Sequence, residues 1–288
     1  MVKDTKDHKL QSAGAKPPTL VIEPNKNWQL QAWRELVRYK DLLYFLVVRG
    51  IKARYAQSVL GVSWAVIQPL FTTLVFTVIF GNLVKVGSDG LPYVLFSFSG
   101  MVIWNYFSNT LTESSNSVVQ NASMITKVYF PRIVLPLSAA FSKMLDFLIG
   151  FVVLIGFLIY FRVMPSINIL WLPVVILVML LFSLGIGSFL SALSVQYRDV
   201  KHALSFLVQI LMYACPVVYP MSAIPEQYRL LYALNPMVGV IEGFRASLIP
   251  TLPFPYVPFG LGAAVALLVF FGGTYYFHKF ERKFADVA

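Results

Sequence analysis

The stretch NILWLPVVILVMLLFSLGIGSFLSAL, residues 168–193, carries no charged side chain from its first position to its last. Its apolar residues do not alternate as in a half-buried strand, and it exceeds the roughly 20 residues that a helix needs to cross a bilayer. Lipid offers a bare backbone no hydrogen-bond partner, so an isolated apolar segment in a membrane must be helical. Residues 168–193 therefore predict a transmembrane helix.

Five further apolar segments accompany this one along the chain. They are residues 62–84, 93–111, 137–161, 203–220 and 258–277. Of the 288 residues, 58% are hydrophobic and only 12% are charged, a composition that water-soluble domains of this size do not have. We therefore predict an all-α integral membrane protein whose residues 62–288 form a transmembrane domain of six helices.

The formal net charge of +10 raises the question of a nucleic-acid partner. Membrane proteins concentrate Lys and Arg in their cytoplasmic loops, and this chain shows that asymmetry. With the N-terminus inside, Lys143 lies within a span, and the outer segments hold only four of the 23 basic residues: Lys85, Arg162, Arg229 and Arg245. The distribution of the basic residues along the chain thus indicates the topology of the protein in the membrane. We predict cytoplasmic termini and no nucleic-acid binding.

Two regions precede the first span. Residues 1–27 are polar and lack the apolar core of a signal peptide, so we expect a flexible cytoplasmic tail. Residues 28–61 have helical character up to Tyr55 but no apolar run long enough to cross. Leu30 and Trp33 fall on one arc of a helical projection, opposite charged residues, which predicts an amphipathic helix in the membrane interface. Farther along, Arg54 interrupts the apolar stripe.

Residues 221–257 are largely apolar but rich in proline, which removes backbone donors and stops helices. A continuous span is therefore excluded, and we predict a re-entrant pair of short helices on the outer side that closes the pore. An ordinary folded outer loop is the alternative. Glu242 and Arg245, three residues apart, are candidate gate residues that either pair locally or both face water. We expect an exposed pair that contributes about 0–1 kcal/mol to folding.

Catalytic chemistry has no evident place in this sequence. No Gly-Lys dipeptide occurs, so the phosphate-binding Walker A pattern is absent and the chain is not expected to hydrolyse ATP. His8, His202 and His278 lie far apart without companions at metal-ligand spacing. We predict that the chain is not an enzyme and holds no metal or cofactor of its own.

Ionisable residues within the predicted spans are confined to Lys143 and Asp146. Their spacing of three places them on one helix face, where they can pair with each other. A structural pair is one interpretation, and a proton relay of an ion-coupled carrier is the other.

Four stretches resemble the permease subunits of ABC exporters for O-antigen, capsule and teichoic-acid polymers. They are YKDLLYFLVVRGIKARYAQSVLGVSWAVIQPL (39–70), MITKVYFPRIVLPLS (124–138), SVQYRDVKHAL (194–204) and ALNPMVGVIEGFR (233–245). The resemblance implies a homodimer in the bacterial inner membrane, served by two copies of a separate ATPase subunit that binds ATP and Mg²⁺. Its substrate would be a lipid-linked glycan, and export of a lipid or drug is the alternative.

The resemblance also implies roles for residues on the cytoplasmic side. Residues 124–131 correspond to a coupling helix that docks into the ATPase, while an interfacial aromatic belt is the alternative. The docking candidates are Ile125, Lys127, Val128, Tyr129, Phe130 and Arg132, with Tyr197, Arg198 and Asp199 as a second contact or as helix caps. Leu60 and Gly61 correspond to the pore's cytoplasmic mouth.

In the same family the first and fifth spans line the pore, and aromatic rings offer a sliding polymer surfaces to stack on. The candidates are Trp64, Phe71, Phe76, Phe80, Phe206, Tyr213 and Tyr219. For each of them, lipid contact or helix packing is the alternative. Small residues of the fourth span predict close helix packing, namely Gly185, Gly187, Ser188, Ser191 and Ala192.

Overall fold

A computed structural model describes residues 37–56, 61–165, 167–281 and 284, and within these ranges all regular secondary structure is helical. The elements before the middle of the chain are α2 (Lys40–Tyr55), η1 (Gly61–Ser63), α3 (Trp64–Phe76), the π-helix η2 (Thr77–Leu83), α4 (Tyr93–Gln120), α5 (Ala122–Ile125) and α6 (Val134–Tyr160). The remainder are η3 (Ile167–Trp171), α7 (Leu172–Gln196), α8 (Val200–Tyr213), η4 (Met221–Ala223), α9 (Glu226–Ala233), α10 (Pro236–Leu248) and α11 (Tyr256–Glu281).

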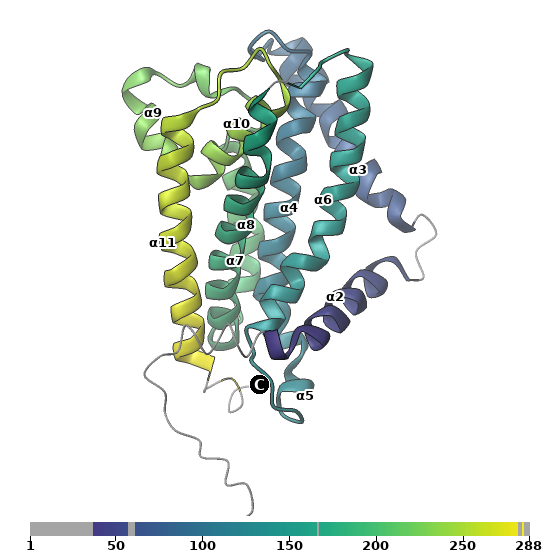
Figure 1. Cartoon of the computed structure of the whole chain (residues 1–288), viewed down its shortest axis with the longest axis vertical. Helices are drawn as coiled ribbons and strands as arrows, with labels where there is room; N and C mark the ends of the chain where they lie inside the picture. The colour runs from purple at the N-terminus through teal and green to yellow at the C-terminus, as the bar shows by residue number, and fades with distance from the viewer. Residues whose placement is uncertain (1–36, 57–60, 166, 282–283, 285–288) are drawn as a thin grey trace, which may run out of the picture.

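The long helices lie side by side along the long axis of the molecule (Figure 1). We call the two ends of this bundle the α5 end and the α9 end, after the short helices found there. Within the described residues, four helical stretches are long and apolar enough to cross a membrane: Gly61–Leu83, Val134–Tyr160, Ile167–Gln196 and Tyr256–Glu281. They match four of the six predicted spans.

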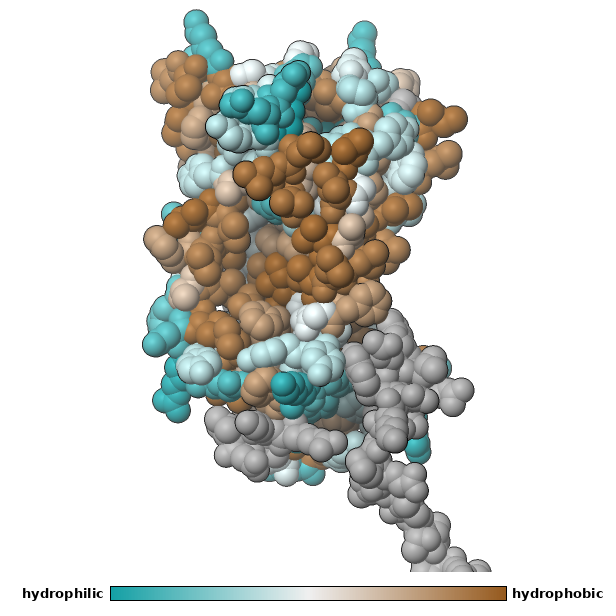
Figure 2. Space-filling view, turned by 90° about the vertical axis from the view of Figure 1, so that its left-hand side faces the viewer, coloured by the Kyte–Doolittle hydropathy of each residue, from teal (hydrophilic) through white to brown (hydrophobic). Residues whose placement is uncertain are grey.

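The distribution of apolar and polar residues on the surface also indicates a membrane protein. An apolar belt crosses the middle of the molecule, and hydrophilic residues gather toward both ends (Figure 2). Such a belt is what a bilayer requires of the protein surface that it surrounds.

The second predicted span is longer and more polar than expected. α4 continues past residue 111 to Gln120 and therefore includes Glu113. It lies at the centre of the bundle, packed against α6 and α7. Its buried serines bridge to these helices, with Ser114 donating to the Pro136 carbonyl at 3.2 Å and Ser117 3.3 Å from the hydroxyl of Ser191.

α7 and α11 approach each other closely because both present glycine at the contact. A Cβ added to Gly185 would lie 2.6 Å from the Cα of Phe270, so no larger residue fits there without a shift. All five small residues predicted to pack are buried on α7. The packing interpretation of this segment is confirmed.

The fifth predicted span, residues 203–220, is not one continuous helix. α8 ends at Tyr213, and the chain continues through a non-helical break, residues 214–220. Pro216 and Pro220 lie in this break and lack the N–H groups that would extend the helix.

The two short helices expected within 221–257 are α9 and α10. Pro225 directly precedes α9, and Pro236 is the first residue of α10, where a missing N–H costs nothing. Almost every residue of α10 is buried, and the helix packs on α4, α7 and α11. The alternative of an ordinary solvent loop is therefore wrong for α10, whereas α9 is largely exposed.

The predicted interface helix is seen in its second half as α2, which crosses obliquely at the α5 end (Figure 1). Its packing partner is α6. The expected tail, residues 1–27, and the apolar arc with Leu30 and Trp33 lie outside the described residues, as does Leu60 of the predicted pore mouth.

Candidate functional site

A group of ion pairs joins α2, α4 and α6 toward the α5 end. Arg54 of α2 lies 2.6 Å from Asp146 of α6, and Tyr55 donates a hydrogen bond to the same carboxylate. Burial, reinforced by this hydrogen bond, raises the pKa of Tyr55 to about 12, which keeps its hydroxyl protonated as a donor. Arg54, which interrupts the predicted apolar stripe, thus holds α2 against α6 through its ion pair with Asp146.

Lys143 does not pair with Asp146 as the sequence suggested. Its ammonium group lies 3.6 Å from the carboxylate of Glu113 on α4, and its side chain is 10% exposed. The physical reason is the length of α4, because the extra turns beyond residue 111 bring Glu113 within reach of α6. Each carboxylate thus has a cation on another helix.

α4 carries a polar stripe that sequence reasoning missed. Its members each lie three or four residues from another member, and each is partly or fully exposed: Asn105, Ser108, Asn109, Thr112, Glu113, Asn116 and Gln120. Residues at these spacings share one helix face. α4 also contacts α3 and α8, the two helices predicted to line the pore. Polar side chains on an exposed face of a membrane helix require water or protein beside them rather than lipid.

The predicted pore-lining aromatics divide into two groups. Trp64, Phe71, Phe206 and Tyr213 are between 50% and 68% exposed. Phe76, by contrast, is buried and packs edge-on against Phe80 with ring centroids 5.7 Å apart. Tyr219 is half-buried and donates to the Tyr213 carbonyl at 2.8 Å.

The segment expected to be a coupling helix is mostly a turn. α5 ends at Ile125, so residues 124–131 do not form a helix as predicted. The Thr126 hydroxyl donates to backbone carbonyls one turn back, which competes with helix continuation, and Pro131 follows shortly. The non-helical segment continues to residue 133, and α6 begins at Val134.

The apolar docking candidates in this turn face in two directions. Ile125 and Phe130 are 7% and 4% exposed and belong to a buried cluster with residues of α6 and α11. Val128 and Tyr129 are 58% and 84% exposed. The first pair is thus part of the core, and the second pair lies at the surface of the described chain.

The charged docking candidates also differ in their surroundings. Lys127 is exposed, whereas Arg132 binds Glu281 of α11 through its backbone N–H, at 2.8 Å, and through its guanidinium. Tyr197, Arg198 and Asp199 are exposed in the α7–α8 turn, where the Asp199 side chain makes no capping hydrogen bond to α8. This turn and α5 lie at the same end of the bundle (Figure 1).

Gly61 begins the first span with φ at +48°, a left-handed conformation that glycine adopts without strain. The role of Gly61 at the pore's cytoplasmic mouth stays a prediction.

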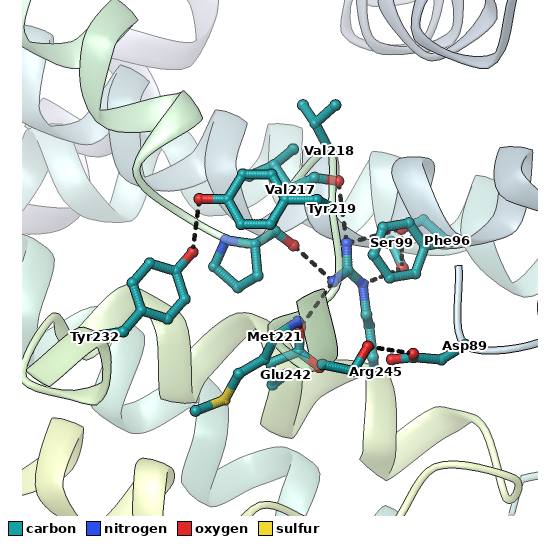
Figure 3. Close-up of polar contacts among 12 residues, drawn as sticks. Asp89, Phe96, Ser99, Val217, Val218, Tyr219, Met221, Tyr232, Glu242 and Arg245 are labelled. Carbon is teal, nitrogen blue, oxygen red and sulfur yellow. Dashed lines mark hydrogen bonds and ion pairs between the residues drawn. The ribbon is translucent and has the colours of Figure 1, made fainter. Parts of the chain in front are cut away.

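At the α9 end, Arg245 is fully buried among polar partners from three segments: α4, the break after α8, and α10 itself (Figure 3). Its guanidinium donates to the carbonyls of Pro216 at 2.6 Å, Val217 at 3.2 Å and Phe96 at 3.0 Å, and its Nε donates to Ser99. It also lies 3.6 Å from the centroid of the Phe96 ring.

Glu242 completes this cluster. Its carboxylate lies 3.2 Å from Arg245 and accepts the N–H of Met221 at 3.3 Å, and its side chain is only 12% exposed. The predicted local pairing is confirmed, but the expectation of an exposed pair is wrong. The reason is that α10 is inserted into the bundle, which the sequence did not reveal.

The cluster satisfies the backbone of the break after α8. The carbonyls of Pro216 and Val217 accept from Arg245, and that of Val218 accepts from the Tyr93 hydroxyl at 2.7 Å. These side chains replace the hydrogen bonds that a continuous helix would have made. We call Arg245, Glu242, Ser99, Phe96 and residues 216–218 the arginine cluster.

Comparison with known proteins gives a consistent set of matches. A family model described as ABC-2 type transporter matches residues 41–249. The O-antigen export system permease protein RfbA of Myxococcus xanthus is 30% identical over 255 residues, covering 88% of this chain and 97% of that protein. RfbA of Klebsiella pneumoniae is 29% identical, with 86% and 95% covered. The polysialic acid transport protein KpsM of Escherichia coli is 24% identical, with 71% and 80% covered.

Proposed function

This chain belongs to the ABC-2 type transporter family, and from this membership we propose that it is the membrane permease of an ATP-driven exporter of O-antigen-like or capsular polysaccharide. The observation that carries the proposal is the polar stripe of α4. It lies beside helices whose exposed residues are mainly aromatic and aliphatic, which suits a hydrated polymer with both hydroxyl groups and C–H faces.

The stripe supports a homodimer. On one chain it is open to the surroundings, and lipid there would leave the side-chain amides of Asn105 and Asn109 without hydrogen-bond partners. In the proposed assembly, a second copy faces the stripe, and the two copies enclose a water-filled route flanked by α3 and α8.

Six crossings are proposed for the transmembrane domain. Besides the four apolar stretches, α4 crosses as a partly polar central helix, and α8 crosses together with the break that follows it. The α5 end then faces the cytoplasm together with both termini, in the bacterial inner membrane. Burial of Arg245 leaves Lys85, Arg162 and Arg229 as the basic residues of the outer segments, so the charge asymmetry is stronger than the sequence suggested.

The α5 end is the proposed docking surface for two copies of a separate ATPase subunit, which bind ATP and Mg²⁺. Tyr129 and Val128 project from the turn after α5, next to the exposed Lys127. Exposed aromatic residues flanked by charge are typical anchors of protein interfaces. Tyr197, Arg198 and Asp199 supply a second contact at the same end.

At the α9 end, residues 221–257 are proposed to close the outer mouth of the route at rest. The arginine cluster holds α10 against the break after α8, so that these two segments move together or not at all.

Deletion of the chain in its host, with complementation, tests the proposed function. A polysaccharide permease leaves lipid-linked glycan inside the cell when it is lost, and the wild-type chain restores glycan at the surface. A lipid or drug exporter would leave the distribution of glycan unchanged. An ion-coupled carrier would instead show transport that Asp146→Asn makes insensitive to the proton gradient, and it would not copurify with an ATPase.

A further inference from the structure

A polar pocket of about 330 Å³ lies where α2, α3, α4 and α6 meet. Its size is at the small end of the roughly 300–1,000 Å³ typical of ligand pockets. Its lining includes Trp64 and Gln68 of α3, Asn105 and Asn109 of α4, and Asp146 of α6. Two of these residues, Asn105 and Asn109, belong to the polar stripe, so the pocket opens off the proposed route beside the middle of α4 and α6.

The pocket offers hydrogen-bonding groups that the protein itself does not use. Within the described residues, the side-chain amides of Gln68, Asn105 and Asn109 make no hydrogen bond, although each has two donors and an acceptor. The indole of Trp64 is about half exposed beside them, with relative exposure 51%. Planar amides next to an exposed aromatic face suit a ligand that combines hydroxyl groups with C–H surfaces.

The charges of the pocket favour a neutral ligand. Arg54 is engaged by Asp146 at 2.6 Å, and Lys143 is engaged by Glu113 at 3.6 Å. A diphosphate would have to displace these carboxylates from their cations and would then face two uncompensated acids. Sugar hydroxyls, in contrast, can donate to Asp146 and accept from the amides without breaking either pair.

We propose that this pocket binds a sugar residue of the exported glycan, with the ring stacked on Trp64 and its hydroxyls bound by Gln68, Asn105 and Asn109. The proposal rests on the proposed function and adds a specific sugar subsite along the route. The subsite contacts the neutral sugar and not the charged lipid head group.

Photo-crosslinking in glycan-producing cells tests the subsite in the complete exporter. p-Benzoylphenylalanine is placed at Asn109, at Gln68, or at Phe271 as a control, since Phe271 is 55% exposed on α11, away from α3 (Figure 1). We expect glycan-bearing adducts at 109 and 68 but not at 271. The adducts should keep their glycan after mild acid cleaves the diphosphate linkage.

Two results would overturn the subsite. One is the absence of glycan adducts at both positions while the same cells display normal surface glycan. The other is an adduct that loses its glycan in mild acid, which would assign the pocket to the lipid head group. Absence of surface glycan even with the wild-type chain would instead contradict the proposed function.

Side-chain removal gives a second, independent readout. Asn109→Leu and Gln68→Leu should each slow the appearance of surface glycan about threefold to tenfold at equal membrane abundance, as expected for one lost hydrogen bond. Phe271→Leu should not change it. Normal rates in both pocket variants would contradict the proposal.

Discussion

The two ends of the bundle use charged residues in opposite ways. At the α9 end, Arg245 is fully buried and every partner of its guanidinium belongs to the protein, whereas at the α5 end Arg54 and Asp146 are 24% and 20% exposed beside an open polar pocket. A buried, fully partnered charge fixes one arrangement of the backbone. A partly exposed pair allows water and substrate nearby. The α9 end is therefore built for rigidity, and the α5 end for access.

The largest effect is expected at the α9 end. Arg245→Ala leaves Glu242 buried without its cation and the carbonyls of Pro216 and Val217 without their side-chain donor, and should lower stability by about 3–5 kcal/mol. Thermal unfolding of the purified protein measures this loss. Arg229→Ala is the matched control, because its partner Glu226 is 89% exposed, and it should cost no more than about 1 kcal/mol. Equal unfolding temperatures for the two variants would show that burial of Arg245 does not matter.

The turn after α5 should separate folding from partner binding. Phe130→Ala removes a buried ring and should destabilise the chain by about 3 kcal/mol. Tyr129→Ala, at a side chain that is 84% exposed, should cost less stability than Phe130→Ala but weaken copurification of the ATPase subunit by about 2 kcal/mol or more. Normal ATPase association in the Tyr129 variant would remove this turn from the proposed docking surface.

A smaller effect is expected where α2 joins α6. Because Arg54 and Asp146 are partly exposed, a double-mutant cycle with Arg54→Gln and Asp146→Asn should give a coupling energy of about 1 kcal/mol. The same cycle on Arg245 and Glu242 should give a clearly larger value. Coupling energies in the reverse order would contradict the contrast between the two ends.

The sequence predicted features that depend on local composition. The four most apolar spans, the packing role of Gly185 and its neighbours, and the two proline-initiated helices α9 and α10 all follow from residue type and spacing. The arginine cluster does not, because its acceptors are carbonyls of residues nearly thirty and nearly 150 positions away, such as Pro216 and Phe96. Only the folded chain brings these groups to Arg245.

The polar stripe could have been predicted from the sequence. Asn105, Asn109, Thr112 and Asn116 recur at helical spacing, and this period was visible before the structure. A second span that ends at residue 111, as predicted, cuts this stripe in two. It also leaves Glu113 outside the helix, so that Glu113 is not expected as the partner of Lys143. The coupling helix was expected from the resemblance to other permeases. The observed helix is shorter because the Thr126 hydroxyl hydrogen-bonds to backbone carbonyls one turn back.

Cysteine accessibility along α4 tests the central claim, that the polar stripe lines a hydrated route for glycan. Single cysteines at Asn109, Thr112 and Asn116, in a Cys215→Ser background, are compared with one at the exposed Phe271 of α11 in the complete exporter. The thiolate is the form of cysteine that attacks thiol reagents, and it forms in water and not in lipid. We expect the three stripe positions to react quickly and to be protected when lipid-linked glycan is present, with position 271 unreactive in both states. Stripe cysteines as unreactive as position 271 would contradict the account.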